Sequence, residues 1–489
     1  MKKYFLIIPF LIFQFVEKIC SQLLIPAGVV ETGQAAVVLF DPSVWSDNPD
    51  RIVEGINGER IRANEIYEQW KNPAIVVYGG SAVPRGHKYY ELSIETGKVI
   101  WNSGFSIRSG AGPGIMEGCS IGANEARGKR HPSNDVDIQG IRIQLPFEQK
   151  TNRYVDVVEY YNYMITRKLA LSLNTKGAVF FPGGPGTFDE FFEEWRRNGL
   201  FVLMGSDFWI PFVNALSNSL KSAEIYVGEF PKITDSPEEA INYIKKKSEK
   251  KRVTHYDKKR IIRINKEFTE DMQQLSRLSP AITFLGNPKN NHPALKNLED
   301  LIYMLLDSRM PVRTGSKGAL FETVSHCIRD ADDLHSLQIA MMASPKRRRM
   351  MVKKEVLNYL FPTSDVNHRV LLVENSKAFI FIPGGIETMC QLFDFLDLMK
   401  CEKIQDRPII LMDRSFWQPI VDALNDIANN PNFPVIEPQH LESIHVADTA
   451  NEVFNILIAK GVVPSTKFAA NININRISLR KDAVISNSN

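Results

Sequence analysis

The chain has 489 residues, of which 44% are hydrophobic and 24% charged, and its formal net charge is +3. This length suits two domains better than one, and the composition is ordinary for a globular protein. A charge so close to neutral gives no electrostatic argument for nucleic acid as a partner. The five cysteines form no C-x-x-C pair and the nine histidines show no metal-ligand spacing, so neither a disulfide framework nor a metal site is indicated.

The N-terminus carries the one targeting signal in the sequence. A basic start over residues 1–3 precedes an apolar run over 4–16, which is too short to cross a bilayer but has the length of a signal h-region. We interpret residues 1–22 as a signal-like leader, and because the cleavage site around Cys20 is poor, both an export signal and a leader without function stay open. No later segment predicts a stable membrane span. The extension over 23–70 has no assignable role.

An internal repeat runs through the rest of the chain. Three segments recur in the same order about 200 residues later, with small changes of offset: 74–79 as 281–286, 178–184 as 378–385, and 203–211 as 411–419. The sequence therefore predicts two copies of one domain, which we call the first copy (71–250) and the second copy (276–462). A charged run over 245–252 predicts a solvated helix end and linker between them, and a polar tail follows over 463–489.

Each copy alternates short β-branched runs with helical segments. This alternation is typical of the α/β class and predicts two tandem Rossmann-like, doubly wound domains with mostly parallel sheets. Ligands of such sheets bind beyond the carboxyl ends of the strands. The glycine-rich turns of both copies fall at such strand ends.

The most informative turn is the run FPGGPGTFDE over 181–190, which follows the apolar stretch 177–180. It predicts a strand, a tight glycine turn and the first turn of a helix. Glycine backbone can approach an anion closely and the helix N-terminus adds partial positive charge, so a phosphate would suit this turn. Glu190 stands one turn into the helix, where its carboxylate would have to face another part of the ligand.

A second glycine-rich turn, SGAGPGIMEG over 109–118, comes earlier in the first copy. It lacks the Lys-Ser/Thr of a triphosphate P-loop, and no acid stands where a dinucleotide fingerprint needs one for the ribose. Two such turns in one domain favour a mononucleotide-type ligand. Between them, helical spacing over 160–171 would place Tyr163 and Arg167 on one face. Taken alone, Arg167 and Lys168 favour a solvated helix patch over a functional site.

The order of these motifs (SGxGPGIME, LPxEQ over 145–149, Arg-Lys at 167–168, and PGGxGTxxE) resembles the Lonely Guy (LOG) family. The resemblance covers about residues 70–245 well and the second copy loosely. Members of that family are nucleoside 5′-monophosphate phosphoribohydrolases, often misnamed lysine decarboxylases. The resemblance implies a Rossmann-like domain, usually dimeric, with its site near the subunit interface. It also implies cleavage of the N-glycosidic bond of a nucleoside monophosphate to a free base and ribose 5-phosphate, without cofactor or metal.

Roles for single residues follow from the resemblance. Glu190 and Arg167 match the catalytic glutamate and arginine of the family. The remaining site residues would bind the substrate, mainly at its 5′-phosphate, with Glu117 and Lys168 placed nearby: Gly110, Gly112, Gly114, Glu117, Lys168, Gly183, Gly184, Gly186 and Thr187. Structural alternatives exist, since an acid is favourable in a first helical turn and threonine is a common N-cap. Pyridoxal chemistry has no support, because no lysine with an acid partner for the ring nitrogen can be singled out.

The second copy departs from this pattern. At its matching turn the third glycine has become Glu387 and the catalytic glutamate has become Gln391, while His368 stands where the first copy has Arg167. An acid at 387 would repel a phosphate, so we predict that this copy is catalytically inactive. The two copies would then form an intrachain pseudo-dimer, or the chain a homo-oligomer, in which the second copy completes the pocket of the first. The basic run 346–349 could contribute phosphate contacts or be a solvated face.

Two classes of function stay open. The leading hypothesis is a hydrolase acting on a nucleoside monophosphate, and the alternative is a non-catalytic nucleotide-binding sensor or carrier using the same turns. A dinucleotide-dependent oxidoreductase is disfavoured because the ribose acid and a proton-transfer pair are missing. The sequence does not name the base. A cytoplasmic location is favoured because an exported enzyme would meet little nucleotide, although the leader keeps export open.

Overall fold

The computed structural model describes residues 49–70, 72–128, 137–145, 150–248, 280–315, 318–330, 338–342, 359–362 and 376–464. All of these belong to one compact unit that spans residues 47–489. The signal-like leader, the LPxEQ motif beyond residue 145, most of the linker, the basic run 346–349, His368 and the tail from 465 onward lie outside the described residues.

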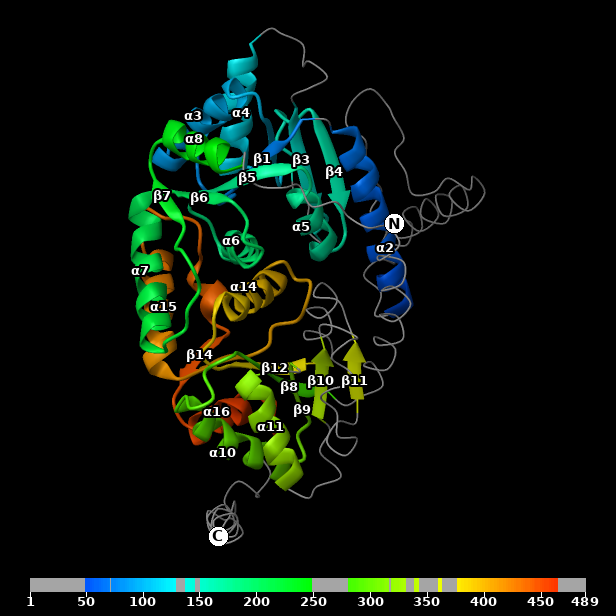
Figure 1. Cartoon of the computed structure of the whole chain (residues 1–489), viewed down its shortest axis with the longest axis vertical. Coiled ribbons are helices and arrows are strands. Elements are labelled where there is room, and N and C mark those ends of the chain that lie inside the picture. The colour runs from blue at the N-terminus through cyan, green and yellow to red at the C-terminus, as the bar shows by residue number, and fades with distance from the viewer. Residues whose placement is uncertain are drawn as a thin grey trace, which may run out of the picture. The chain divides into compact units, whose positions relative to one another are not determined.

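The first copy is built on a seven-stranded sheet of order β4-β3-β2-β1-β5-β6-β7 (Figure 1). Every neighbouring pair is parallel, and the order reverses between β1 and β5, so β1 and β5 flank the topological switch point where doubly wound sheets bind ligands. The strands are β1 (Ala74–Tyr78), β2 (Ser106–Ser109), β3 (Ile138–Ile143), β4 (Val157–Tyr161), β5 (Thr175–Phe180), β6 (Phe201–Met204) and β7 (Lys232–Thr234).

The second copy repeats this topology. Its sheet has the order β11-β10-β9-β8-β12-β13-β14, which is the same path through seven parallel strands. The α/β class and the tandem Rossmann-like arrangement predicted from the sequence are therefore confirmed. The strands are β8 (Ala281–Leu285), β9 (Val312–Gly315), β10 (Gln338–Met342), β11 (Tyr359–Pro362), β12 (Ser376–Phe381), β13 (Ile409–Met412) and β14 (Ile444–Ala447).

Helices follow most strands, as crossover connections between parallel strands require. In the extension and the first copy they are α2 (Pro49–Gln69), α3 (Lys88–Asn102), α4 (Ile115–Arg127), α5 (Met164–Ser172), α6 (Pro185–Arg196), α7 (Ser206–Ser222) and α8 (Pro237–Ser248). In the second they are α10 (Ala294–Asp307), α11 (Gly318–Asp330), α14 (Ile386–Lys400), α15 (Arg414–Ala428), the short η3 (Pro438–Leu441) and α16 (Ala450–Ala459). Part of the extension is thus the helix α2, which packs on α5.

One helical prediction was wrong at its start. The spacing over 160–171 predicts a helix, but Tyr160 and Tyr161 belong to the edge strand β4, and α5 begins only at Met164. Tyr163 is the N-cap of α5, and its carbonyl accepts the first helical hydrogen bond from the N–H of Arg167. A half-buried edge strand that runs into a helix produces a mixed periodicity, which sequence spacing cannot separate over so few residues.

The two copies pack against each other through equivalent helices. α6 contacts α14 and α7 contacts α15 (Figure 1). Phe393 of α14 stacks on Phe188 and Phe192 of α6, with ring centroids 4.9 and 5.2 Å apart. One apolar core cluster consequently continues from the first copy into the second, and the helix that carries Glu190 is part of that shared core.

Candidate functional site

The helix that carries Arg167 and Lys168 is held at both ends by buried charged side chains. At its start, the Glu59 carboxylate of α2 accepts hydrogen bonds from the N–H groups of Asn162 and Tyr163 at 2.6 and 3.3 Å. At its end, Arg108 of β2 donates to the carbonyls of Ala170 and Leu171 at 3.0 and 3.1 Å. A carboxylate at a helix N-terminus and a cation at its C-terminus both complement the helix dipole.

Arg167 and Glu190 form a buried ion pair. Arg167 Nη1 lies 2.5 Å from Glu190 Oε1, and their side chains are 13% and 9% exposed. The guanidinium also packs on the first glycine turn, since a Cβ atom at Gly110 would lie 2.7 Å from Arg167 Nη2. The structure thus brings together the two predicted catalytic residues and Gly110. They lie beyond the carboxyl ends of β2 and β5, on either side of β1.

The environment of this pair raises the pKa of Glu190. Burial raises the pKa of the Glu190 carboxyl to about 7, and Asp397 of the second copy adds to this, whereas Arg167 and Lys168 oppose it. Burial is the largest single influence and disfavours the charge on Arg167, but the combined attraction of Glu190, Tyr78 and Asp397 holds the pKa of Arg167 above its usual range. Near neutral pH the site therefore combines a permanent cation with a carboxyl group close to half ionisation.

The turn between β5 and α6 is tightly packed. Gly184 is the N-cap of α6, so Thr187 lies inside the first turn and is not the cap. A Cβ atom at Gly183 would lie 2.1 Å from the hydroxyl oxygen of Thr187. A Cβ atom at Gly184 would meet the carbonyl oxygen of Val435 at 2.5 Å, and one at Gly186 would meet Asp397 Oδ1 at 2.7 Å. Only glycine fits these places, and two of the three close neighbours come from the second copy.

The glycine turn after β2 is also packed closely against neighbouring backbone and side chains. Gly114 is the N-cap of α4 with φ of 68°, and a Cβ atom there would lie 2.3 Å from the carbonyl oxygen of Gly80 at the end of β1. At Gly112 the neighbour is Met116 at 2.7 Å. Glu117 is held apart from Arg167 and Glu190 by other partners: Arg85 and Tyr90 donate to its carboxylate at 2.7 and 2.8 Å.

Lys168 links the two copies. Its Nζ lies 2.5 Å from Asp189 Oδ2 on α6 and 2.6 Å from Asp394 Oδ1 on α14. All three side chains are at most 10% exposed. Two acidic side chains therefore surround this ammonium within the protein. Because Lys168 follows Arg167 and Asp189 precedes Glu190 in the chain, these contacts link both residues of the ion pair to α14 of the second copy.

Sequence reasoning missed the groups that the second copy brings to this region. Lys403 donates to the carbonyls of Gln144 and Asn162, at the ends of β3 and β4, at 2.6 and 3.3 Å. Burial lowers the pKa of Lys403 to about 7. Asp394, Asp397 and Lys403 had no signal in the sequence, because they follow a degenerate motif and reach the site only through the packing of α14 on α6. Glu59 was missed because it lies in the unassigned extension.

At its own turn the second copy presents an acid. Glu387 occupies the position of Gly186 and forms an ion pair with Arg196 of α6, Oε2 to Nε at 3.5 Å. Gln391, at the position of Glu190, is 7% exposed. Glu387 therefore serves the contact between the copies. The prediction that this copy is inactive stays a prediction.

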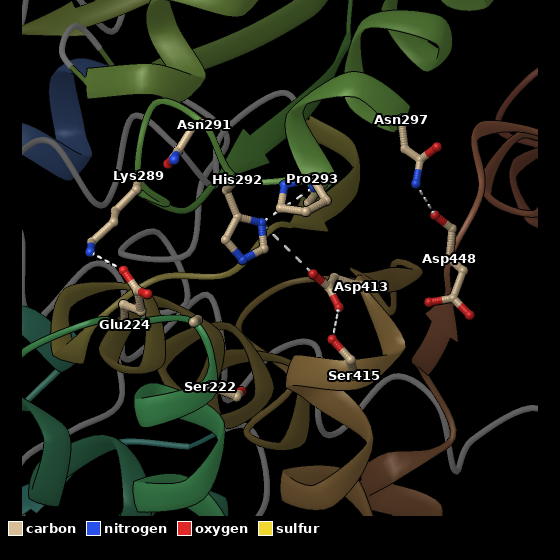
Figure 2. A pocket seen from close by; sticks show the side chains of 12 residues that line it. Ser222, Glu224, Lys289, Asn291, His292, Pro293, Asn297, Asp413, Ser415 and Asp448 are labelled. Atoms are coloured by element: carbon tan, nitrogen blue, oxygen red, sulfur yellow. Dashed lines mark hydrogen bonds and ion pairs between the residues drawn. The ribbon is translucent and has the colours of Figure 1, made fainter.

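A separate polar cavity of about 430 Å³ lies at the carboxyl edge of the second sheet (Figure 2). Lys289 pairs with Glu224 on its rim, and His292 Nδ1 lies 3.8 Å from Asp413 Oδ2. Asp413 has φ of 95° at the N-cap of α15, where the first copy has Gly205 with φ of 100°. The aspartate has a backbone conformation that suits glycine, and its side chain caps α15 by accepting a hydrogen bond from the N–H of Phe416.

No group of three or more His, Cys, Asp or Glu side chains is arranged to hold a metal ion in the parts of the chain that the structure describes. None of the helices in those same ranges is long and apolar enough to cross a membrane.

The parallel sheets define a doubly wound α/β protein, and the buried pair beyond the switch point marks a candidate ligand site in its first copy. The family model described as "Possible lysine decarboxylase" matches residues 116–244 and again 325–457. Because these matches cover more than half of the sequence, the chain belongs to that family, and the double match supports a tandem duplication.

Comparisons with solved structures find distant likenesses. The X-ray structure of TM1055, a structural genomics target, shares 23% identity over 27% of this chain and 72% of its own, with a TM-score of 0.22. The molybdenum cofactor binding protein of the phototrophic bacterium Rippkaea orientalis shares 16% identity over 37% of this chain and 98% of its own, with a TM-score of 0.28. Among curated proteins, none matches the sequence. Similarity at this level says nothing of function.

Proposed function

We propose that the first copy hydrolyses the N-glycosidic bond of a nucleoside 5′-monophosphate and releases a free base and ribose 5-phosphate. The observation that carries this proposal is the buried pair of Arg167 and Glu190. The pair lies beside Gly110 of the turn after β2, and Glu190 belongs to the first part of α6, which follows the turn after β5. Family membership agrees with the proposal, because the motifs of the first copy resemble those of phosphoribohydrolases.

The chemistry needs a carboxylate near C1′ of the ribose. When the C–N bond breaks, the ribose becomes oxocarbenium-like, and a carboxylate stabilises that charge while water adds to C1′. Glu190 would take this part in its ionised form. Its pKa of about 7 gives a substantial ionised fraction at neutral pH. Arg167 would hold the substrate in position and offset negative charge that develops on the leaving base, which finally takes up a proton.

The two turns would hold the rest of the substrate. The start of α6, with Gly183, Gly184, Gly186 and Thr187, offers backbone N–H groups at a helix N-terminus, which suits a phosphate. Gly110, Gly112 and Gly114 of the other turn would contribute further contacts to the substrate. Because Lys168 is surrounded by Asp189 and Asp394, we assign it a part in holding the site together.

We further propose that the two copies act as an intrachain pseudo-dimer. The second copy contributes Asp394 to Lys168, Asp397 to the Gly186 turn and Lys403 to the ends of β3 and β4. A chain that ends after Lys250 would expose the apolar face of α6 and lose these contacts. A truncated protein of that length that stays stable and fully active would contradict the pseudo-dimer.

The test of the function is release of ribose 5-phosphate from a panel of purine and pyrimidine nucleoside monophosphates, with Glu190→Gln in parallel. Turnover that falls by a factor of about 10² to 10⁴ in the variant, with ligand binding retained, supports the hydrolase. Tight nucleotide binding without turnover in the wild-type protein would favour the sensor or carrier instead. A cytoplasmic location belongs to the same proposal, because its substrate is an intracellular nucleotide.

A further inference from the structure

The last turn of α14 in the second copy approaches the phosphate turn of the first copy. Lys400 ends α14, and its side chain reaches back over Gly184, so that a Cβ atom on that glycine would lie 3.3 Å from Lys400 Nζ. The carbonyl oxygen of Val435, also from the second copy, lies 2.5 Å from the same Cβ position. The ammonium therefore lies directly above the backbone at the start of α6.

The charge of Lys400 is available to a ligand. Across the ranges that the structure describes, Lys400 takes part in no hydrogen bond or ion pair, and its side chain is exposed. It also lines a cavity of about 880 Å³ together with Met399, Lys403 and His440. On the side of the second copy the ammonium is therefore accessible to solvent.

The surroundings of Lys400 contain both signs of charge. Asp397 lies one turn earlier on α14, and its Oδ1 is 2.7 Å from a Cβ atom placed on Gly186. Burial raises the pKa of Asp397, which favours its neutral form, while Lys400 opposes this. An anion at the turn would therefore meet Asp397, whose neutral form is favoured by burial, and the ammonium of Lys400 above Gly184.

Resting on the proposed function, we infer that Lys400 of the second copy binds the 5′-phosphate of the substrate at the glycine turn of the first copy. A lysine binds phosphate as a point charge, and the N–H groups at the N-terminus of α6 supply directional hydrogen bonds to the same group. The site for the phosphate is then shared between the copies. This gives the second copy a direct part in substrate recognition, although its own turn carries an acid.

The inference is tested with the full-length chain carrying Lys400→Met, which removes the charge and keeps most of the length. We expect KM for a nucleoside monophosphate to rise about tenfold to a hundredfold and the affinity for ribose 5-phosphate to fall by the same factor. Cleavage of the matching nucleoside, which has no phosphate, should not change. Lys400→Arg should retain most of the affinity. Lys221→Met, an exposed lysine in the last turn of α7, is the matched control for loss of a helix-end charge.

Failure of this inference can be told apart from failure of the proposed function. Wild-type turnover with unchanged KM and unchanged ribose 5-phosphate affinity in Lys400→Met would overturn the part of Lys400 and leave the hydrolase standing. Calorimetric binding of ribose 5-phosphate that needs Lys400, in a protein without turnover, would support the phosphate site and overturn the hydrolase. A wild-type protein that binds ribose no more weakly than ribose 5-phosphate would overturn the inference outright.

Discussion

The Glu190 carboxyl group should lower the stability of the protein at the pH where it works. Burial raises its pKa to about 7 from an ordinary value of 4.5. A raised pKa means that folding favours the protonated form, so the contribution of Glu190 to stability is fully present below about pH 4.5 and is lost as the pH rises through about 7. The difference between these values corresponds to about 3 kcal/mol in the free energy of unfolding.

Glu190→Gln isolates this effect, because glutamine stays neutral at every pH and can still accept a hydrogen bond from Arg167. We expect the variant to match the wild-type protein at pH 4.5 and to be more stable by about 3 kcal/mol at pH 8.5, while turnover is lost. The assay is urea unfolding followed by tryptophan fluorescence at a series of pH values. Glu238→Gln, an exposed acid in the first turn of α8, provides the matched loss of charge and should change stability by no more than about 0.5 kcal/mol.

A variant that is less stable than the wild-type protein at pH 8.5 would refute the reasoning. It would mean that the attraction between Arg167 and an ionised Glu190, whose atoms are 2.5 Å apart, outweighs the cost of burying the carboxylate. An equal gain in stability at pH 4.5 and pH 8.5 would also refute it, since the gain would then arise from packing and not from charge.

Three further predictions concern the scaffold around the site. Glu59→Ala removes the carboxylate at the start of α5 and should cost about 1–2 kcal/mol by thermal unfolding, with reduced turnover; a neutral result would deny it a positioning role. Lys168→Met and Asp394→Leu should show a coupling energy of at least about 1.5 kcal/mol in a double-mutant cycle, and additive effects would contradict the buried link between the copies. Gly122→Ala should destabilise the packing of α3 on α4 by more than about 2 kcal/mol in urea unfolding, because its Cβ would lie 1.8 Å from the carbonyl oxygen of Ile94; unchanged stability would show that the helices can separate there.

Local pattern was enough to predict the scaffold of the first copy. The apolar runs that became β1 and β8 were recognisable because buried parallel strands are continuously hydrophobic. The turns after β5 and β2 leave no space for a side chain, so they require glycine, and clustered glycines are directly visible in the sequence. Arg167 and Glu190 were found through the ordered motifs and not through local physics, since an arginine beside a lysine on a helix is ordinarily solvated.

The contribution of the second copy was not predictable in the same way. Asp394 and Lys168 are separated by more than 200 residues, and nothing near either one indicates the other. Their meeting depends on how α14 packs on α6, which follows from shape and apolar burial over the whole helix pair. The start of α5 was misjudged for a related reason: whether Tyr160 joins a strand or a helix is decided by its neighbour β3, which pairs with it from elsewhere in the sequence.

The ion pair between Arg196 and Glu387 affects which copies can pack against each other. Under the offset that aligns the two turns, Arg196 corresponds to Asp397 and Gly186 corresponds to Glu387. Two second copies placed face to face would oppose Glu387 to Asp397, acid against acid, whereas the mixed pair sets Glu387 against Arg196. In a symmetric homodimer both subunits present the same set of residues at the interface, whereas the two copies of this fused chain can present different residues. The two faces of the fused chain are therefore complementary in charge at this contact, and pairing of one second copy with another is disfavoured.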